Sequence, residues 1–199
     1  MEDYKARIHD AAVQVFAEKG IDSTTLADIA ATAGLDEAAL HVYYRDTETL
    51  FRTISTEQTN AFIGTMLIAC ETIEEPEPFL REIVRIVDNM LMSNPDFLRI
   101  TLHAMLERRE IFFHTMESPL FPREVFDRFQ WFMDEGKLRR VDPVQLALIL
   151  DSLTFFTQVL RDQLELGQIS DKQIEAFMQA RHDTVLQTLL HGLLPQDDR

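Results

Sequence analysis

Residues 25–50 read TLADIAATAGLDEAALHVYYRDTETL, and this stretch decides the fold. Apolar residues recur at helical spacing on both sides of Gly34, which predicts two short amphipathic helices joined by a tight turn. Ala30 lies four residues before the glycine and is small enough for the two helices to cross closely. This outline predicts a helix-turn-helix motif, whose second helix would place residues 37–42 in the major groove of DNA.

Residues at the helix ends support this prediction. Thr25 and Asp28 form a capping-box-like start for the first short helix. Asp36 is a natural N-cap for the second, and Asp46 is one for a long helix that follows.

The stretch from Ala11 to Leu50 resembles the DNA-binding domain of TetR/AcrR-family transcriptional regulators. The matching residues are Ala11, Phe16, Gly20, Thr24, Thr25, Ile29, Ala30, Ala33, Gly34, Leu40, Tyr43, Tyr44, Glu48 and Leu50. The resemblance implies a repressor that binds a palindromic double-stranded DNA operator as a homodimer and is released by a small hydrophobic effector. It also implies a helix-turn-helix DNA-binding domain at residues 1–48 and an effector-binding and dimerisation domain at residues 49–199.

The rest of the chain is also predicted to be helical. Glycine is scarce, prolines fall between periodic segments and no stretch alternates like a strand, so we expect an all-α fold of about nine helices. Residues 74–78, EEPEP, predict a break between helices. The remaining helices are expected at about residues 3–19, 46–72, 78–92, 95–116, 122–135, 143–166 and 171–193.

Several residues of the motif are candidates for contacting DNA. Glu37 could accept a hydrogen bond from a cytosine amino group, and His41 could donate one to a guanine. Ala38 or Ala39 could touch a thymine methyl group. The candidate phosphate contacts are Thr24, Thr25, Tyr43, Tyr44 and Arg45.

The charge of this region opposes DNA binding. Residues 1–52 carry five basic and ten acidic side chains, a net charge of −5, in a chain whose net charge is −15. Most protein–DNA affinity comes from lysines and arginines that neutralise phosphates. The family usually has a tyrosine and a lysine where this chain has His41 and Thr47, so we expect weak or salt-sensitive DNA binding.

The alternative is a TetR-like protein with weak or lost DNA binding that acts through a protein partner. Its acidic face would dock a basic partner. The residues of that face are Asp36, Glu37, Asp46 and Glu48.

Aromatic and methionine side chains crowd the second half of the chain. By resemblance, such a domain encloses a pocket for an apolar effector, with Arg99 and His103 as the polar groups that orient it. Stripes of this kind also form ordinary core, so both interpretations stay open. The candidate ligand-binding residues are Met92, Arg99, His103, Met105, Phe112, Phe129, Phe132 and Phe155.

The last two predicted helices are too apolar for one domain's core to cover. Pairing with a second copy into a four-helix interface would cover them, and two-fold symmetry would set two recognition helices about one DNA turn apart. Burial in the chain's own core is the alternative. The candidate interface residues are Ile149, Leu153, Phe156, Leu160, Leu186, Leu189 and Leu190.

Other classes of function have little support in the sequence. His103, Glu107, Glu110 and His114 share one helical face, but their spacing fits a solvated charged face better than a metal site. No nucleophile elbow or phosphate-binding glycine loop is present, so we expect neither an enzyme nor a cofactor. The single cysteine, Cys70, is expected to be buried. Without a signal peptide or membrane span, the expected location is cytoplasmic.

Overall fold

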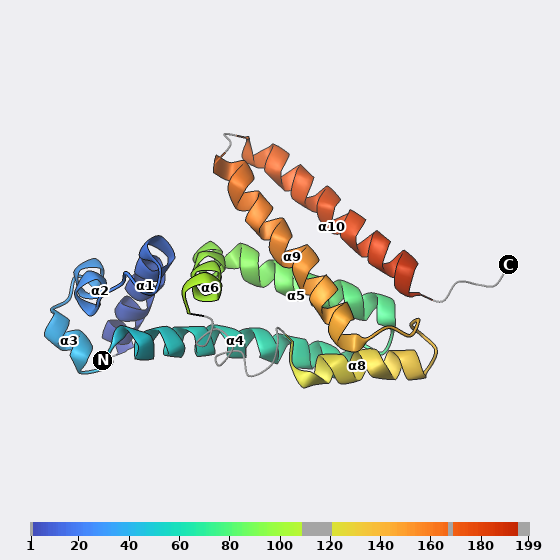
Figure 1. Ribbon diagram of the computed structural model, residues 1–199, viewed down its shortest axis with the longest axis horizontal. Helices are drawn as coiled ribbons and strands as arrows, with labels where there is room; N and C mark the ends of the chain where they lie inside the picture. Colours follow the sequence, from blue (N-terminus) through green and yellow to red (C-terminus); the bar gives the residue numbers. More distant parts are fainter. Residues whose placement is uncertain (1, 109–120, 167–168, 195–199) are drawn as a thin grey trace. The chain divides into compact units, whose positions relative to one another are not determined.

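The computed structural model describes residues 2–108, 121–166 and 169–194, and within these ranges it contains nine helices and no strand (Figure 1). The expected all-α class is confirmed. The helices are α1 (Glu2–Lys19), α2 (Leu26–Ala33), α3 (Glu37–His41), α4 (Thr47–Thr72), α5 (Pro76–Ser93), α6 (Pro95–Glu107), α8 (Arg123–Asp134), α9 (Pro143–Leu166) and α10 (Asp171–Leu193).

Most helix ends lie within two residues of the predicted boundaries, but α6 ends at Glu107. Arg108 has non-helical backbone angles, φ −136° and ψ +61°, so the prediction of a continuous helix over residues 95–116 is wrong at Arg108. Helix α5 begins at Pro76, two residues before the predicted start at residue 78. The first turn of a helix has no intrahelical partner for its backbone amides, so it tolerates both Pro76 and Pro78. Residues 109–116 of the helix predicted at 95–116 lie outside the described part of the chain.

The chain forms two compact units. The first consists of Met1–Ala61 and Asn94–Glu117, and the second of Phe62–Ser93 and Ser118–Arg199. Helix α4 therefore begins in the first unit and ends in the second, and α6 belongs to the first. The predicted domain boundary after residue 48 remains a prediction.

The core of the first unit is shared by α1, α2, α3, the start of α4, and α6. Phe16 and Phe51 meet edge to face, with ring centroids 5.5 Å apart. Helix α6 contributes Ile100 and Ala104 to the same cluster. Its other fully buried members include Ile8, Ala12, Ile29, Leu40, Leu50 and Ile54.

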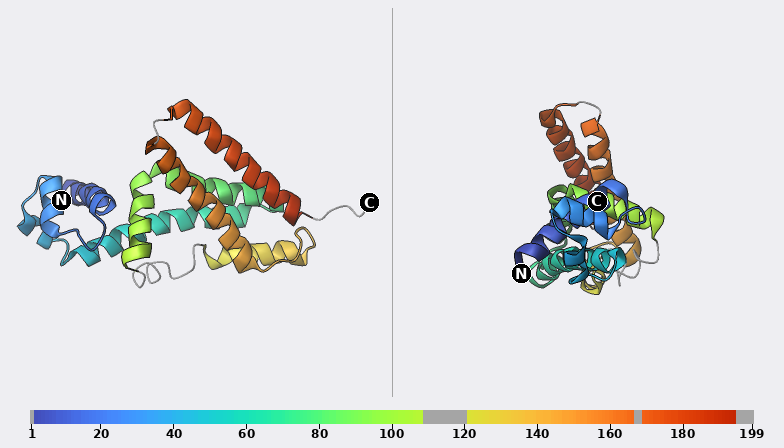
Figure 2. Two further views of the ribbon diagram at one scale, coloured as in Figure 1. Left: turned by 45° about the horizontal axis from the view of Figure 1, so that its top comes forward. Right: turned by 90° about the vertical axis from the view of Figure 1, so that its left-hand side faces the viewer.

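The second unit is built around α5 and α9. Phe79 of α5 packs against Phe129 and Phe132 of α8, with ring centroids 5.6 and 5.5 Å away. Helices α9 and α10 lie side by side and antiparallel (Figure 2). Asp88 of α5 ties both to the core, because it binds His182 of α10 at 2.7 Å and Gln158 of α9 at 3.3 Å.

Helix α9 is as apolar as the sequence predicted, and it is also long. By length and composition, Pro143–Arg161 passes the test for a membrane-spanning helix, whereas the sequence predicted no such segment. One such helix is weak evidence for a membrane span: α9 packs against α5, α8 and α10, although only 33% of the apolar segment is buried.

Cys70 on α4 is half-buried rather than fully buried. Burial raises the pKa of its thiol to about 11. The reactive thiolate is therefore scarce at neutral pH, which fits the expected inert role.

Candidate nucleic-acid interface

The turn between α2 and α3 has the predicted helix-turn-helix geometry. Thr25 caps α2, since its hydroxyl accepts the Asp28 amide while the Asp28 carboxylate accepts the Thr25 amide. Gly34 ends α2 with φ +63°, a left-handed conformation that favours glycine. Asp36 caps α3 by accepting the Ala38 amide at 3.2 Å. The predicted caps are confirmed.

Arg7 of α1 stabilises this turn by hydrogen bonds. Its Nη2 atom donates to the carbonyl oxygens of Ala33 at 2.6 Å and Gly34 at 3.1 Å. These carbonyls lie at the C-terminus of α2, where a positive charge is stabilising. Arg7 was not predicted as a contact of this turn, because no local pattern links it to residues 26 positions away.

The outward face of α3 carries Glu37, Ala38, His41 and Val42, all exposed. His41 Nε2 lies 3.8 Å from Glu37 Oε1, one helical turn away. Val42 is 78% exposed, although it is aliphatic. Val42 falls within residues 37–42, which were predicted to lie in the major groove, but it was not predicted as a contact residue.

The predicted phosphate contacts differ in how available they are. Thr24 is buried, and its hydroxyl donates to the Gly20 carbonyl at 2.6 Å. Tyr43 and Tyr44 are half-buried against the core of the first unit. Arg45 extends into solvent, and its Nε donates to Asp46 at 3.1 Å. Thr25 is exposed but is engaged in the α2 cap described above.

Carboxylates occupy the helix N-termini in this region. Asp46 Oδ1 accepts the Thr49 amide at 2.8 Å and the Thr49 hydroxyl at 2.6 Å, and these bonds lower the pKa of Asp46. The hydrogen bond from Lys19, followed by those from Thr25, lowers the pKa of Asp28 to about 2. Backbone amides at helix N-termini are common phosphate ligands, so these caps place negative charge where DNA phosphates would otherwise bind.

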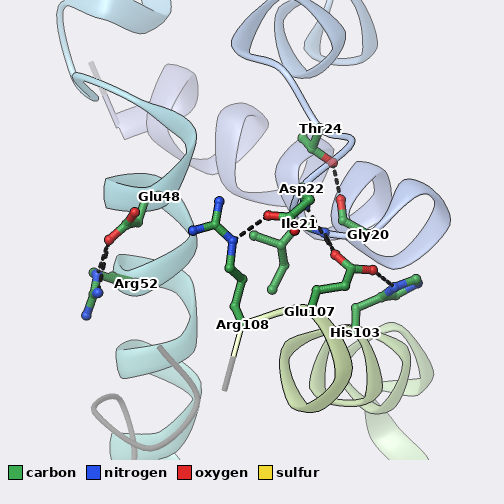
Figure 3. Close-up of polar contacts among 9 residues, drawn as sticks. All are labelled: Gly20, Ile21, Asp22, Thr24, Glu48, Arg52, His103, Glu107 and Arg108. Atoms are coloured by element: carbon green, nitrogen blue, oxygen red, sulfur yellow. Dashed lines mark hydrogen bonds and ion pairs between the residues drawn. The ribbon is translucent and has the colours of Figure 1, made fainter. Parts of the chain in front are cut away.

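Helix α6 is fastened to the turn that precedes α2 (Figure 3). Glu107 Oε2 accepts the backbone amides of Ile21 at 2.9 Å and Asp22 at 3.2 Å. Glu107 Oε1 lies 2.6 Å from His103 Nδ1. Arg108, directly after α6, forms an ion pair with Asp22. We use the name α6 clamp for the side chains of His103, Glu107 and Arg108 together with the turn at Ile21 and Asp22.

The electrostatics of the α6 clamp keep Glu107 ionised. Burial alone raises the pKa of this carboxyl, but the hydrogen bonds from His103 and from the Asp22 and Ile21 amides outweigh burial and lower it. Because an ionised carboxylate only accepts hydrogen bonds, the close His103 Nδ1 atom carries the shared hydrogen.

Gly20 is required at the α6 clamp for two reasons. Its φ of +80° is unfavourable for any other residue. A Cβ atom at this position would also lie 2.5 Å from Glu107 Oε1 and 2.8 Å from His103 Nδ1. The clamp therefore depends on the bare backbone of Gly20.

His103 and Glu107 thus do not form the solvated charged face that we expected. Each side chain is about two-thirds buried, and Glu107 bonds the turn before α2. Glu110 and His114 lie outside the described residues. Within the described part of the chain, no group of three or more histidine, cysteine or acidic side chains could hold a metal ion.

The predicted ligand-binding residues are divided between the two units. Arg99, His103 and Met105 lie on α6 in the first unit, where Arg99 is 3.6 Å from Asp96. Phe112 lies outside the described residues. The remaining residues belong to the second unit, where Phe129 and Phe132 are buried, Phe155 is half-buried and Met92 is exposed.

The predicted interface residues also differ in exposure. Ile149 and Phe156 of α9 are exposed, and Phe156 is 61% accessible. Leu153, Leu160 and Leu189 are half-buried. Leu186 and Leu190 are buried within the chain itself. The exposed apolar side chains of α9 and α10 also include Val144, Leu148 and Phe177.

Sequence comparison identifies the N-terminal domain. Residues 8–54 match the family model described as bacterial regulatory proteins, tetR family. The chain is 36% identical over 63 residues to the biofilm operon icaADBC HTH-type negative transcriptional regulator IcaR of Staphylococcus epidermidis. That alignment covers 32% of this chain and 34% of the relative, so the chain matches about a third of the relative's length.

Solved structures match nearly the whole chain. One is the transcriptional regulator FadR from Bacillus subtilis in complex with stearoyl-CoA, with TM-score 0.76, 18% identity and coverage of 94% of this chain and 98% of that one. Another is AibR in complex with isovaleryl coenzyme A and operator DNA, with TM-score 0.69, 21% identity and coverage of 94% and 97%. At these identities the likeness establishes the fold.

Proposed function

Residues 8–54 match the tetR family of bacterial regulatory proteins, and from that match we propose that the protein is a transcriptional repressor that binds a palindromic operator as a homodimer. The α2–turn–α3 geometry carries the proposal. The caps at Thr25, Gly34 and Asp36 hold a short helix whose outer face is exposed, as a reading helix in the major groove requires. The protein acts in the cytoplasm as a regulator and not as an enzyme.

The polar side chains of α3 contact the bases. Glu37 accepts a hydrogen bond from a cytosine amino group, and His41 donates one to a guanine. Both side chains are about half exposed and lie on one face of the helix, so they can reach neighbouring base pairs. Arg45 is the best-placed phosphate contact, because its side chain is 91% exposed.

Dimerisation uses the exposed apolar surface of α9 and α10. A monomer would leave the apolar side chains of Ile149, Phe156 and Phe177 in water, which is unfavourable. A second copy related by a two-fold axis covers this surface with the same residues. The same axis duplicates α3 and so matches the two halves of a palindrome.

The α6 clamp links the effector to DNA binding. Only Asn94 separates the end of α5 from the start of α6, so a shift of α5 on effector binding pulls on α6. The hydrogen bonds of Glu107 to Ile21 and Asp22 pass that shift to the turn before α2. The effector then releases the operator by changing the orientation of the recognition helix.

The effector is a small hydrophobic molecule. The second unit is rich in aromatic side chains, such as Phe79, Phe129 and Phe132, and apolar ligands bind in surroundings of this composition. Two structures with the same fold contain acyl-CoA thioesters, stearoyl-CoA and isovaleryl coenzyme A. Acyl-CoA thioesters of different chain length are therefore the first ligands to test.

A second candidate function is supported by the acidic caps. Asp36 and Asp46 place carboxylates at the N-termini of α3 and α4, and the first 52 residues have a net charge of −5. Such a surface suits a basic protein partner better than a polyanion. In this alternative the helix-turn-helix is retained as a scaffold and DNA binding is lost.

Selection from random duplexes in dilute buffer separates the two functions. The repressor enriches a palindrome, and His41→Ala loses that enrichment while circular dichroism remains unchanged, because His41 is exposed. Failure to enrich any sequence favours the protein partner, since low salt maximises every favourable phosphate contact. Arg140→Ala in the second unit is a matched control that also removes one surface side chain and leaves enrichment unchanged.

A further inference from the structure

The outward face of α3 consists of two parallel rows. Glu37 and His41 form a polar row, and Ala38 and Val42 form an apolar row beside it, with the members of each pair four positions apart. Val42 caps the helix but keeps helical backbone angles, with φ −68° and ψ −30°. Its side chain therefore continues the line set by Ala38.

The apolar row has no packing role within the first unit. Val42 is 78% exposed, and Ala38 is also exposed, so neither contributes to the core of the unit. Helix α3 contains no lysine or arginine, and Asp36 at its N-terminus is acidic. The helix therefore gains little from phosphate charge, and contacts that do not depend on charge become more important.

Thymine offers the matching chemistry. Its 5-methyl group is the apolar group that the base edges present in the major groove. Side chains one helical turn apart have Cβ atoms about 6 Å apart, while successive bases of one strand rise by about 3.4 Å. The apolar row can therefore cover the methyl groups of two adjacent base pairs.

We propose that Val42, with Ala38 one turn before it, reads thymine 5-methyl groups, so that each operator half-site carries thymine where it faces this row. The proposal rests on the proposed function, because it requires α3 to enter the major groove. It adds the chemical class of the sequence that the helix selects. A valine in this position also rejects cytosine, which lacks the methyl group.

Deoxyuridine substitution tests the proposal, because it removes only the 5-methyl group. Each thymine of the duplex recovered by selection is replaced in turn, and the affinity of the full chain is measured in dilute buffer. We expect one or two positions per half-site at which the affinity falls about fourfold, the effect of losing one methylene-sized apolar contact. Substitution at the same position in both half-sites should then lower the affinity about 15-fold.

Val42→Ala assigns the effect to this side chain. The variant should bind the thymine duplex less tightly and lose its sensitivity to deoxyuridine at one of those positions, with an unchanged melting temperature because Val42 is exposed. Arg140→Ala in the second unit is the control, because it also removes one surface side chain, and it should keep the sensitivity. A palindrome that binds equally well with deoxyuridine throughout overturns this proposal alone, whereas the absence of any enriched duplex overturns the proposed function with it.

Discussion

Gly20→Ala should destabilise the first unit by about 3–4 kcal/mol. Forcing alanine into the left-handed region costs about 1–2 kcal/mol, and the native φ is +80°. The new Cβ atom would lie 2.5 Å from Glu107 Oε1 and 3.0 Å from Oε2, so we expect the flexible carboxylate to shift and Oε2 to leave the amides of Ile21 and Asp22. Each of these bonds contributes about 1 kcal/mol after allowance for solvent exposure. Urea denaturation of the full chain, followed by circular dichroism, measures the loss.

A double-mutant cycle separates backbone strain from the loss of the α6 clamp. In a Glu107→Ala background the carboxylate is already absent, and the His103 ring, 2.8 Å from the new Cβ atom, has lost its partner Glu107 and can rotate away. Gly20→Ala should then cost only the strain of about 1–2 kcal/mol. The two substitutions are then coupled by about 2 kcal/mol. The reasoning is refuted if Gly20→Ala lowers the free energy of unfolding equally in the wild-type and the Glu107→Ala proteins. That result would mean that the hydrogen bonds of Glu107 do not require glycine at position 20.

Two further predictions concern the second unit. Burial raises the pKa of Asp151 to about 6, so the native state binds more protons than the unfolded state between about pH 4 and 6, and stability falls as pH rises through that window. Asp151→Asn should therefore stabilise the chain by at most about 3 kcal/mol above pH 6 and by almost nothing near pH 4; urea denaturation at both pH values checks this, and an equal gain at both would contradict it. Phe156→Glu should convert the proposed dimer to a monomer, because it places charge on a side chain that is 61% exposed on α9. Light scattering measures the mass, and Gln130→Glu on α8 is an exposed control that should leave the mass unchanged.

Local features of the chain were predictable from the sequence because they depend on neighbouring residues. The caps at Thr25 and Asp36 and the turn at Gly34 each involve residues at most four positions apart. The bounds of α9 and α10 follow from proline, from apolar periodicity and from the acidic residue at the start of α10. In all these cases a short pattern contains the whole physical cause.

Contacts between distant residues were not predictable in this way. Glu107 binds the amide of Ile21, 86 positions away, and nothing near either residue indicates the pairing. The spacing of His103 and Glu107 places them on one helical face, but a charged face in solvent and a clamp on another segment have the same spacing. The exposure of Val42 also depends on how α3 packs, since the neighbouring Leu40 is fully buried.

Equilibrium binding of the full chain to the selected palindrome is the most direct test of whether the acidic helix-turn-helix reads DNA. Fluorescence anisotropy of the labelled duplex is measured in dilute buffer, with a scrambled duplex of the same composition as the reference. We predict that one dimer binds the palindrome far more tightly than the scrambled duplex, and that His41→Ala removes the difference. Equal binding of the two duplexes, or binding of neither, would contradict a role for α3 in reading base sequence.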